Sequence, residues 1–113
     1  MKISILLPYK ENFSSKYAGA VSLFVKDTTI NSNFKNIISV FGHTKYKSTL
    51  LKNYINLDIK KSILQSNSRI YVEKILEHEK LLPSDLIEIH NRPNYVKLLS
   101  DKSGNTIIFS FSS

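Results

Sequence analysis

The chain has 113 residues, of which 42% are hydrophobic and 22% are charged, the ordinary proportions of one globular domain with a single core. It has no cysteine, which excludes disulfides and thiolate metal sites. No apolar run approaches the roughly 18 residues of a membrane-spanning helix, and the apolar stretch after Lys2 is shorter than a signal peptide requires. We therefore expect a single domain over residues 1–113, located in the cytoplasm.

The net charge of +7 raises the question of nucleic acid or an anionic membrane as partner. Almost all of this charge comes from scattered lysines, since Arg69 and Arg92 are the only arginines. Abundant isoleucine, asparagine, serine and lysine are typical of an AT-rich genome, which explains the charge without a selected basic surface. A weak peripheral contact with the anionic inner face of a membrane stays open. No specific nucleic acid is expected, because no stacking platform with interleaved basic residues is present.

The amino-terminal part of the sequence predicts a strand, a helix and a second strand. The apolar run at 2–8 ends in proline, which is typical of a buried strand. After a polar loop, the spacing of apolar residues predicts a helix over 18–32. Its inner face would hold Val21, Phe24, Val25 and Thr28, flanked by Leu23 and Ile30. Another apolar run, at 36–42, predicts a strand that glycine stops.

The remaining elements continue the alternation, with residues 43–66 left open except for a third strand suggested by the alternating pattern at 54–59. Residues 68–82 predict a helix with one face formed by Tyr71, Ile75, His78 and Leu82, and with Val72 and Leu76 beside it. A fourth strand at 86–89 leads to Pro93, a residue favoured at the first position of a helix. The expected order then closes with a helix over 93–100, a turn at 101–105 and a final strand at 106–111.

Strands that alternate with helices indicate the α/β class, here a doubly wound, mostly parallel, Rossmann-like sheet with helices on both faces. In such sheets ligands bind outside the carboxyl ends of the strands. The loops expected at that edge are 8–20, 42–47 and 90–94.

Two positions at this edge could carry chemistry. Gly19 lies near the start of the first helix, where free N–H groups and the helix dipole favour an anion; the alternative is a glycine that only allows close packing. His90 directly follows the fourth strand and could act as an acid, a base or a hydrogen-bond donor, or could be structural. Asn91 and Arg92 beside it favour a function, since a guanidinium suits phosphate or carboxylate.

Other signatures do not occur in the sequence. It has no G-x-G-x-x-G fingerprint and no Walker motif. His, Asp and Glu show no metal-ligand spacing, so no metal is expected. No Ser-His-acid arrangement is indicated, and His43, in an unassigned loop, and His78, on a helix face, are weaker candidates than His90.

Several segments together resemble the amino-terminal half of a GT-B glycosyltransferase of the retaining, family 4 type: KISILLP, YAGAVSLFVKD, NIISVFG, SDLIEIHNRPNYV and TIIFSFSS. In that family a glycine-rich loop of the form G-G-x enters the first helix. Its fourth strand commonly reads D-hydrophobic-hydrophobic-H-x-H and precedes a loop with asparagine or glutamate and proline. SDLIEIHNRP is similar to this form, with Glu88 where the first histidine often stands.

The resemblance implies a role for each matching residue. Gly19, with Ala18 and Ala20, would bind the donor diphosphate, although Ala18 replaces a glycine of the family pattern. His90 would be the catalytic residue that contacts the donor sugar, and Asn91 and Arg92 would line the acceptor side. The substrates would be a nucleotide-sugar and a glycan or lipid-linked acceptor, as in cell-envelope polysaccharide assembly, with no further cofactor.

The resemblance covers only the first of the two domains of such an enzyme, and even that domain looks unfinished. The nucleotide-sugar domain is absent from this chain, so the chain alone is not expected to transfer sugars. A final strand at 106–111 would leave an open sheet edge, which predicts a homo-oligomer formed through that strand. The alternatives are a small free-standing α/β module that binds a phosphate-containing or other anionic ligand, and a basic nucleic-acid-binding protein.

Overall fold

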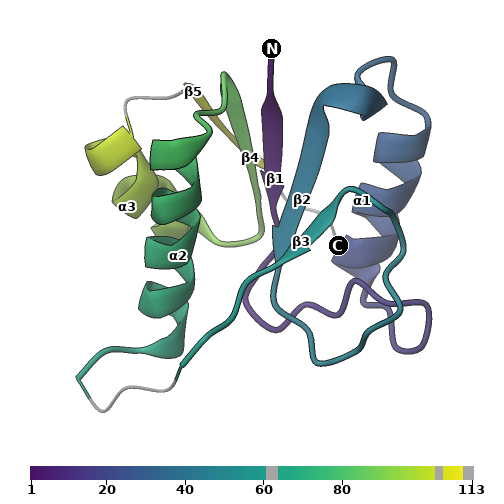
Figure 1. Cartoon of the computed structure of the whole chain (residues 1–113), viewed down its shortest axis with the longest axis horizontal. Helices are drawn as coiled ribbons and strands as arrows, with labels where there is room; N and C mark the ends of the chain where they lie inside the picture. Colours follow the sequence, from purple (N-terminus) through teal and green to yellow (C-terminus); the bar gives the residue numbers. More distant parts are fainter. Residues whose placement is uncertain (61–63, 104–105, 111–113) are drawn as a thin grey trace.

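The structure, a computed structural model, describes residues 1–60, 64–103 and 106–110, with side chains described up to residue 99. Within these ranges the chain forms an α/β fold (Figure 1). The strands are β1 (Ile3–Leu6), β2 (Ile38–Gly42), β3 (Tyr54–Asn56), β4 (Leu86–His90) and β5 (Thr106–Ser110). The helices are α1 (Ala20–Ile30), α2 (Asn67–Leu81) and α3 (Pro93–Ser103), with the short 3₁₀ helix η1 (Lys35–Ile37) before β2.

The strands form one sheet in the order β3-β2-β1-β4-β5, and every neighbouring pair is parallel. This confirms the predicted α/β class with a parallel, Rossmann-like sheet. The assignment to half of a GT-B fold stays a prediction. Strands β3 and β5 are the edge strands of the sheet, which is the position that the predicted self-association through the last strand requires.

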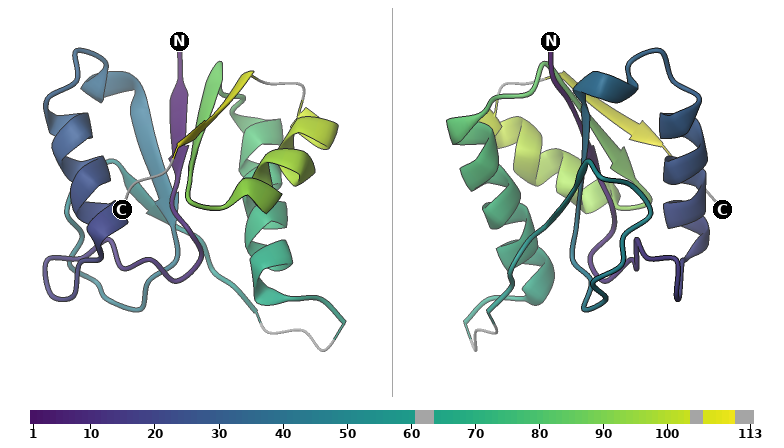
Figure 2. Two further views of the ribbon diagram at one scale, coloured as in Figure 1. Left: turned by 180° about the vertical axis from the view of Figure 1, so that it is seen from behind. Right: turned by 45° about the vertical axis from the view of Figure 1, so that its right-hand side comes forward.

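Helices cover the two faces of the sheet unequally. Helix α1 lies alone on one side, whereas α2 and α3 lie together on the other (Figures 1 and 2). The core under α1 consists of Ile3, Ile5, Leu7, Phe13, Val21, Val25, Ile38 and Val40. The core on the opposite face consists of Leu6, Phe41, Leu57, Tyr71, Val72, Ile75, Ile87, Ile89, Tyr95 and Leu99. Alternate residues of β1 contribute to each core, because successive side chains of a strand point to opposite faces.

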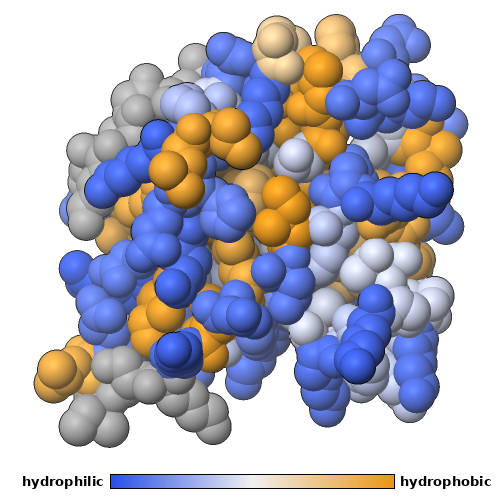
Figure 3. Space-filling view, in the orientation of Figure 1, coloured by the Kyte–Doolittle hydropathy of each residue, from blue (hydrophilic) through white to orange (hydrophobic). Residues whose placement is uncertain are grey.

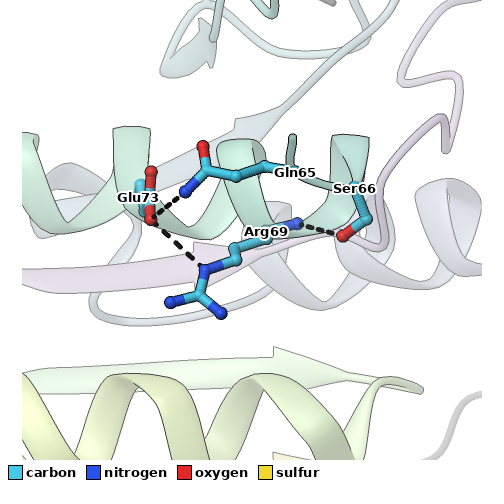
Figure 4. A network of polar contacts seen from close by, with 4 residues as sticks. All are labelled: Gln65, Ser66, Arg69 and Glu73. Carbon is cyan, nitrogen blue, oxygen red and sulfur yellow. Dashed lines mark hydrogen bonds and ion pairs between the residues drawn. The ribbon is translucent and has the colours of Figure 1, made fainter. Parts of the chain in front are cut away.

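Helix α2 begins with a side-chain cap. Ser66 Oγ accepts a hydrogen bond from the Arg69 backbone N–H at 3.2 Å, which satisfies one of the free donors of the first turn. On the outer surface the Glu73 carboxylate accepts from Gln65 Nε2 at 3.1 Å and pairs with Arg69 Nε at 3.5 Å (Figure 4). Because these side chains are largely exposed, their ion pair contributes little to the stability of the helix.

Three details of the predicted elements were wrong. On α1 the buried stripe is Val21, Ser22, Val25 and Thr29, whereas the predicted inner-face residues Phe24 and Thr28 are exposed, Phe24 by 46%. Smaller side chains face the sheet and allow the helix to pack closely, and the Phe24 ring lies at the margin of this interface. The predicted inner-face residue Leu82 follows the end of α2 and is exposed. Residues 101–103, predicted as part of a turn, belong to α3; residues 104–105 and Phe111 lie outside the described residues.

The surface is mixed in polarity. In Figure 3 apolar side chains emerge at separate places among polar ones, rather than in one continuous patch on that face. Every helix in the described part of the chain is too short or too polar to cross a lipid bilayer.

Tyr71 joins α2 to the ends of two strands. Its side chain is fully buried, and its hydroxyl lies 2.7 Å from the carbonyl oxygen of Leu7 and 3.1 Å from that of Phe41, so its single proton is shared between them. These carbonyl groups lie where β1 and β2 approach their carboxyl ends. Burial, followed by the neighbouring Tyr95 and Tyr54, raises the pKa of the Tyr71 phenol well above its ordinary value.

We expect the substitution Tyr71→Phe to lower the free energy of unfolding by about 1–2 kcal/mol, because two buried carbonyl groups lose a donor. Urea unfolding at neutral pH measures this change. The control is Tyr17→Phe, since Tyr17 is exposed and its substitution should leave stability unchanged. Equal stability of the two variants would contradict this role of the Tyr71 hydroxyl.

The same pKa shift predicts how stability depends on alkaline pH. Above about pH 10 the unfolded chain releases the Tyr71 proton while the folded chain retains it, so the wild type loses stability as pH rises. The loss begins near the ordinary phenol pKa and continues upward to the raised pKa of the folded state. The Tyr71→Phe variant should lose stability less steeply over this range.

Candidate functional site

The carboxyl ends of β1, β2 and β4 lie side by side. Leu6 at the end of β1 is in register with Phe41 of β2 on one side and with Ile89 of β4 on the other. The chain leaves β1 toward α1 on one face and leaves β4 toward α3 on the opposite face (Figure 2). Such a divergence opens the position at which parallel α/β sheets bind ligands.

His43 directly follows β2 at this edge and has a fixed orientation. Its Nδ1 lies 2.7 Å from the carbonyl oxygen of Leu57. A carbonyl can only accept, so Nδ1 carries a proton and donates it. The imidazole ring stacks on the ring of Tyr9, with centroids 5.4 Å apart and planes 18° apart. Its Nε2 has no partner among the described residues, so this atom is available to a ligand.

Tyr9 connects the loop after β1 to helix α3. Its backbone N–H donates to the Tyr95 hydroxyl of α3 at 3.2 Å. Its ring also packs at 5.6 Å from the ring of the buried Tyr71. The stacked rings of Tyr9 and His43 are therefore held in place by two contacts of Tyr9, one with the core residue Tyr71 and one with Tyr95 of α3.

Amides and hydroxyls continue this edge toward β3. The Thr44 backbone N–H donates to Asn56 Oδ1 at 2.8 Å, and the Thr44 hydroxyl donates to Asn12 Oδ1 at 2.8 Å. The Tyr54 hydroxyl also donates to Asn56 Oδ1, at 2.9 Å, and burial raises the pKa of Tyr54 above its usual range. These bonds fix the loop after β2 against the loop after β1.

Two cationic side chains come from the loops that flank the divergence. Lys10 Nζ lies 5.7 Å from the centroid of the Tyr9 ring, and Arg92 Nη1 donates to the Asn91 carbonyl oxygen at 2.8 Å. Lys10 and Asn91 both have left-handed backbone conformations, with φ of 71° and 57°. Such conformations are costly outside glycine and are concentrated at functional sites.

The predicted catalytic residue, His90, lies under α1 rather than in the open edge. It is 1% exposed, its Nε2 lies 2.9 Å from Glu88 Oε2, and its ring meets the ring of Phe24 edge-on at 5.9 Å. The alternation of β4 places Glu88 and His90 on the same face, toward α1. The His90 ring is therefore covered by α1, and its catalytic role stays a prediction.

The predicted diphosphate site at Ala18, Gly19 and Ala20 already contains a carboxylate. Gly19 is the N-cap of α1, and Glu11 Oε2 accepts from the Ser22 N–H at 3.1 Å and from the Ser22 hydroxyl at 2.7 Å. A Cβ on Gly19 would lie 2.1 Å from Glu11 Oε2. The glycine therefore makes room for the side chain of Glu11, and an anionic ligand at this helix terminus has to displace that carboxylate.

The sequence pattern predicts a candidate site at the carboxyl ends of the strands, but it does not indicate all of the residues that lie there. It gave little weight to His43, although a histidine directly after a strand-ending glycine is a signal for this position. It did not identify Tyr9 or Glu11, and no residue spacing indicates that Glu11 caps α1 from the preceding loop. His78, the other weak candidate, packs edge-on against Phe41 at 5.3 Å.

Comparison of the chain with protein-family models, with curated proteins and with solved structures gives no match. In the described ranges, no three His, Asp or Glu residues lie together in a way that could hold a metal ion.

We expect Glu11→Ala to lower the free energy of unfolding by about 1–2 kcal/mol, because the first turn of α1 loses a carboxylate that accepts from both the N–H and the hydroxyl of Ser22. Gly19→Ala should be destabilising in the wild type, where the new methyl group meets the Glu11 carboxylate, and much less so in the Glu11→Ala background. A double-mutant cycle by urea unfolding measures this coupling. Additive effects of the two substitutions would show that the glycine is not needed for Glu11.

Proposed function

We propose that the chain is the amino-terminal domain of a GT-B-type glycosyltransferase and that its carboxyl edge binds a sugar and the phosphate attached to it. The observation that carries this proposal is the adjacency of β1 and β4 in a parallel sheet, with Tyr9 and His43 stacked at the carboxyl edge of the sheet and one cation, Lys10 or Arg92, in each of the two diverging loops. The resemblance of the sequence to this class supports the proposal independently. A cytoplasmic location beside the inner face of a membrane accompanies it.

The groups at the edge have the chemistry that a glycosyl phosphate needs. A sugar ring presents C–H groups on its faces, which pack on aromatic rings such as those of Tyr9 and His43. Its hydroxyls can donate to His43 Nε2, the imidazole atom that the described residues leave open. A phosphate suits a guanidinium and an ammonium, which Arg92 and Lys10 supply from opposite sides of the divergence.

The roles that the resemblance assigns fit this arrangement in part. Asn91 and Arg92 lie in the loop after β4, as an acceptor-side contact requires. His90 can reach a donor sugar only if Phe24 and Glu88 release its ring, and a diphosphate at Gly19 requires movement of Glu11. In this proposal the main donor site belongs to the second domain of such an enzyme. The residues at the carboxyl edge of this chain contact the reacting sugar from the other side.

The second candidate function is a module that binds an anion without transferring sugar. Lys10 and Arg92 favour it, because cations in the loops on both sides of the divergence suit any phosphate. The two candidates differ in what the aromatic pair contributes, since a bare phosphate has no face to stack.

The proposal is tested by following backbone amide signals in NMR spectra of the full chain during titration with UDP-glucose, GDP-mannose, UDP, a methyl glycoside and inorganic phosphate. We expect saturable shifts at Tyr9–Asn12, His43–Thr44 and Asn91–Arg92, larger for the sugar-bearing ligands. Shifts confined to phosphate-bearing ligands, with no added effect of the sugar, would favour the anion-binding module. Absence of saturable shifts at these three segments would contradict both functions.

Substitutions at the edge separate the two kinds of contact. Arg92→Gln should weaken binding of the phosphate-bearing ligands by about tenfold, the typical effect of losing one charge-assisted hydrogen bond. Arg69→Gln is the matched control, because Arg69 lies exposed on α2, where its guanidinium pairs with Glu73 of the same helix. His43→Ala should weaken the sugar-bearing ligands and leave inorganic phosphate unchanged.

A further inference from the structure

The loops after β1 and β2 form a second candidate surface, beside the proposed sugar site. Residues 7–19 and 43–49 of these loops lie side by side at the carboxyl edge of the sheet (Figures 1 and 2). The two segments contain four lysines and a single acidic residue, Glu11, whose carboxylate accepts from the Ser22 N–H and hydroxyl. None of the four lysines forms an ion pair among the described residues. Lysines that are scattered along the sequence therefore gather here and make the local potential positive.

Two tyrosine rings from different loops meet within this positive region. The ring centroids of Tyr17 and Tyr46 lie 5.2 Å apart, with their planes inclined by 44°. Tyr17 is 59% exposed, so its ring is accessible to a ligand. The exposed Lys16 precedes Tyr17, and Tyr46 lies between two exposed lysines, of which Lys45 places its Nζ 5.5 Å from the Tyr46 ring centroid. We call Lys16, Tyr17, Lys45, Tyr46 and Lys47 the lysine–tyrosine surface.

Hydrogen bonds between the two loops hold this surface in place. The Leu50 N–H donates to the Phe13 carbonyl oxygen at 3.2 Å, and the hydroxyls of Ser14 and Ser48 lie 3.2 Å apart. The Lys16 N–H donates to the Ser14 hydroxyl, also at 3.2 Å. Because these bonds fix the backbone before Tyr17 and after Tyr46, a ligand does not have to order the two loops when it binds.

The chemistry of the surface favours a single-stranded nucleic acid over a lipid bilayer. Attachment to a membrane depends on buried apolar area as well as on charge. Among the described residues of these two loops, only Tyr17 is a large, exposed hydrophobic side chain. In Figure 3 the lower right corner, where the loops lie in Figure 1, is almost entirely blue or pale. Lysines attract phosphates, and an accessible tyrosine ring offers a face on which any base can stack.

We propose that the lysine–tyrosine surface binds single-stranded nucleic acid without sequence preference. One base stacks on the exposed ring of Tyr17, and neighbouring phosphates pair with the three lysines. The sequence alone does not indicate this platform, because only the fold brings Tyr17 and Tyr46 together. DNA and RNA share the chemistry that is recognised. The lysine–tyrosine surface uses other side chains than the proposed sugar site and does not depend on the glycosyltransferase proposal.

The test follows the fluorescence anisotropy of labelled oligothymidylate and oligouridylate, each of about 12 nucleotides, as the full chain is added. We expect saturable binding that weakens with salt, with a slope of log K against log salt of about −2 for three phosphate contacts. Inorganic polyphosphate of equal charge has no bases and should bind at least about tenfold more weakly. The ratio of the two oligonucleotide affinities shows whether DNA or RNA is the preferred source of the strand.

Substitutions of Tyr17 test the stacking contact. Tyr17→Ala should weaken binding of both oligonucleotides about tenfold, whereas Tyr17→Phe, which keeps the ring, should retain the affinity of the wild type. The matched control is Phe34→Ala, because Phe34 is 54% exposed but precedes β2 at the opposite end of the sheet. Its substitution should leave the binding of oligonucleotides unchanged.

Substitution of Lys45 tests the phosphate contacts. Lys45→Gln should weaken binding and make the salt dependence less steep by about 0.7 in the slope, the contribution of one phosphate contact. Lys74→Gln is the control, because Lys74 lies on α2 and pairs with Glu77. It should change neither the affinity nor the slope.

Oligonucleotide binding that is unchanged by Tyr17→Ala, or that is no stronger than binding of polyphosphate, would overturn the proposal. So would binding to phosphatidylglycerol vesicles that requires Tyr17 and Lys45, with no binding of oligonucleotides, because the partner would then be an anionic membrane. Either result leaves the proposed sugar site untouched, since that site is tested by amide shifts with UDP-glucose and not by oligonucleotide binding.

Discussion

Strand β1 is hydrogen-bonded on both sides and covered on both faces, and this double burial determines where the other elements can lie. All four residues of β1 are buried, with β2 on one side and β4 on the other. Parallel neighbours cannot be joined by tight turns, so each connection must cross a face of the sheet. Because apolar side chains of β1 project to both faces, helices must cover both of them. The divergence of the loops after β1 and β4 follows from this arrangement.

The two ends of the sheet differ in how firmly they are closed. At the amino end the buried Glu79 carboxylate accepts from the Ser84 N–H and hydroxyl, each at 2.7 Å, and the Ser4 hydroxyl donates to it at 3.3 Å. These bonds connect α2, β1 and the segment before β4 in one polar network. At the carboxyl end the polar contacts are formed by loop residues such as Thr44 and Asn12. There the His43 Nε2 atom is unpaired among the described residues. A buried side-chain network therefore stabilises the amino end of the sheet, whereas the polar contacts at the carboxyl end join loops to one another and to the neighbouring elements.

The periodicity of apolar residues was sufficient to predict the order of the elements, because strands and helices of this sheet are buried in continuous runs or stripes. The same periodicity did not predict which side chains of α1 face the sheet. Phe24 is more hydrophobic than Ser22 or Thr29, yet the smaller residues face the sheet, since their size allows a closer approach. The capping role of Glu11 could not be predicted from the sequence either, because Glu11 lies in the loop before α1 and its position depends on the path of that loop. His90 was correctly placed at the end of a strand, but strand alternation turned its ring toward α1 instead of the open edge.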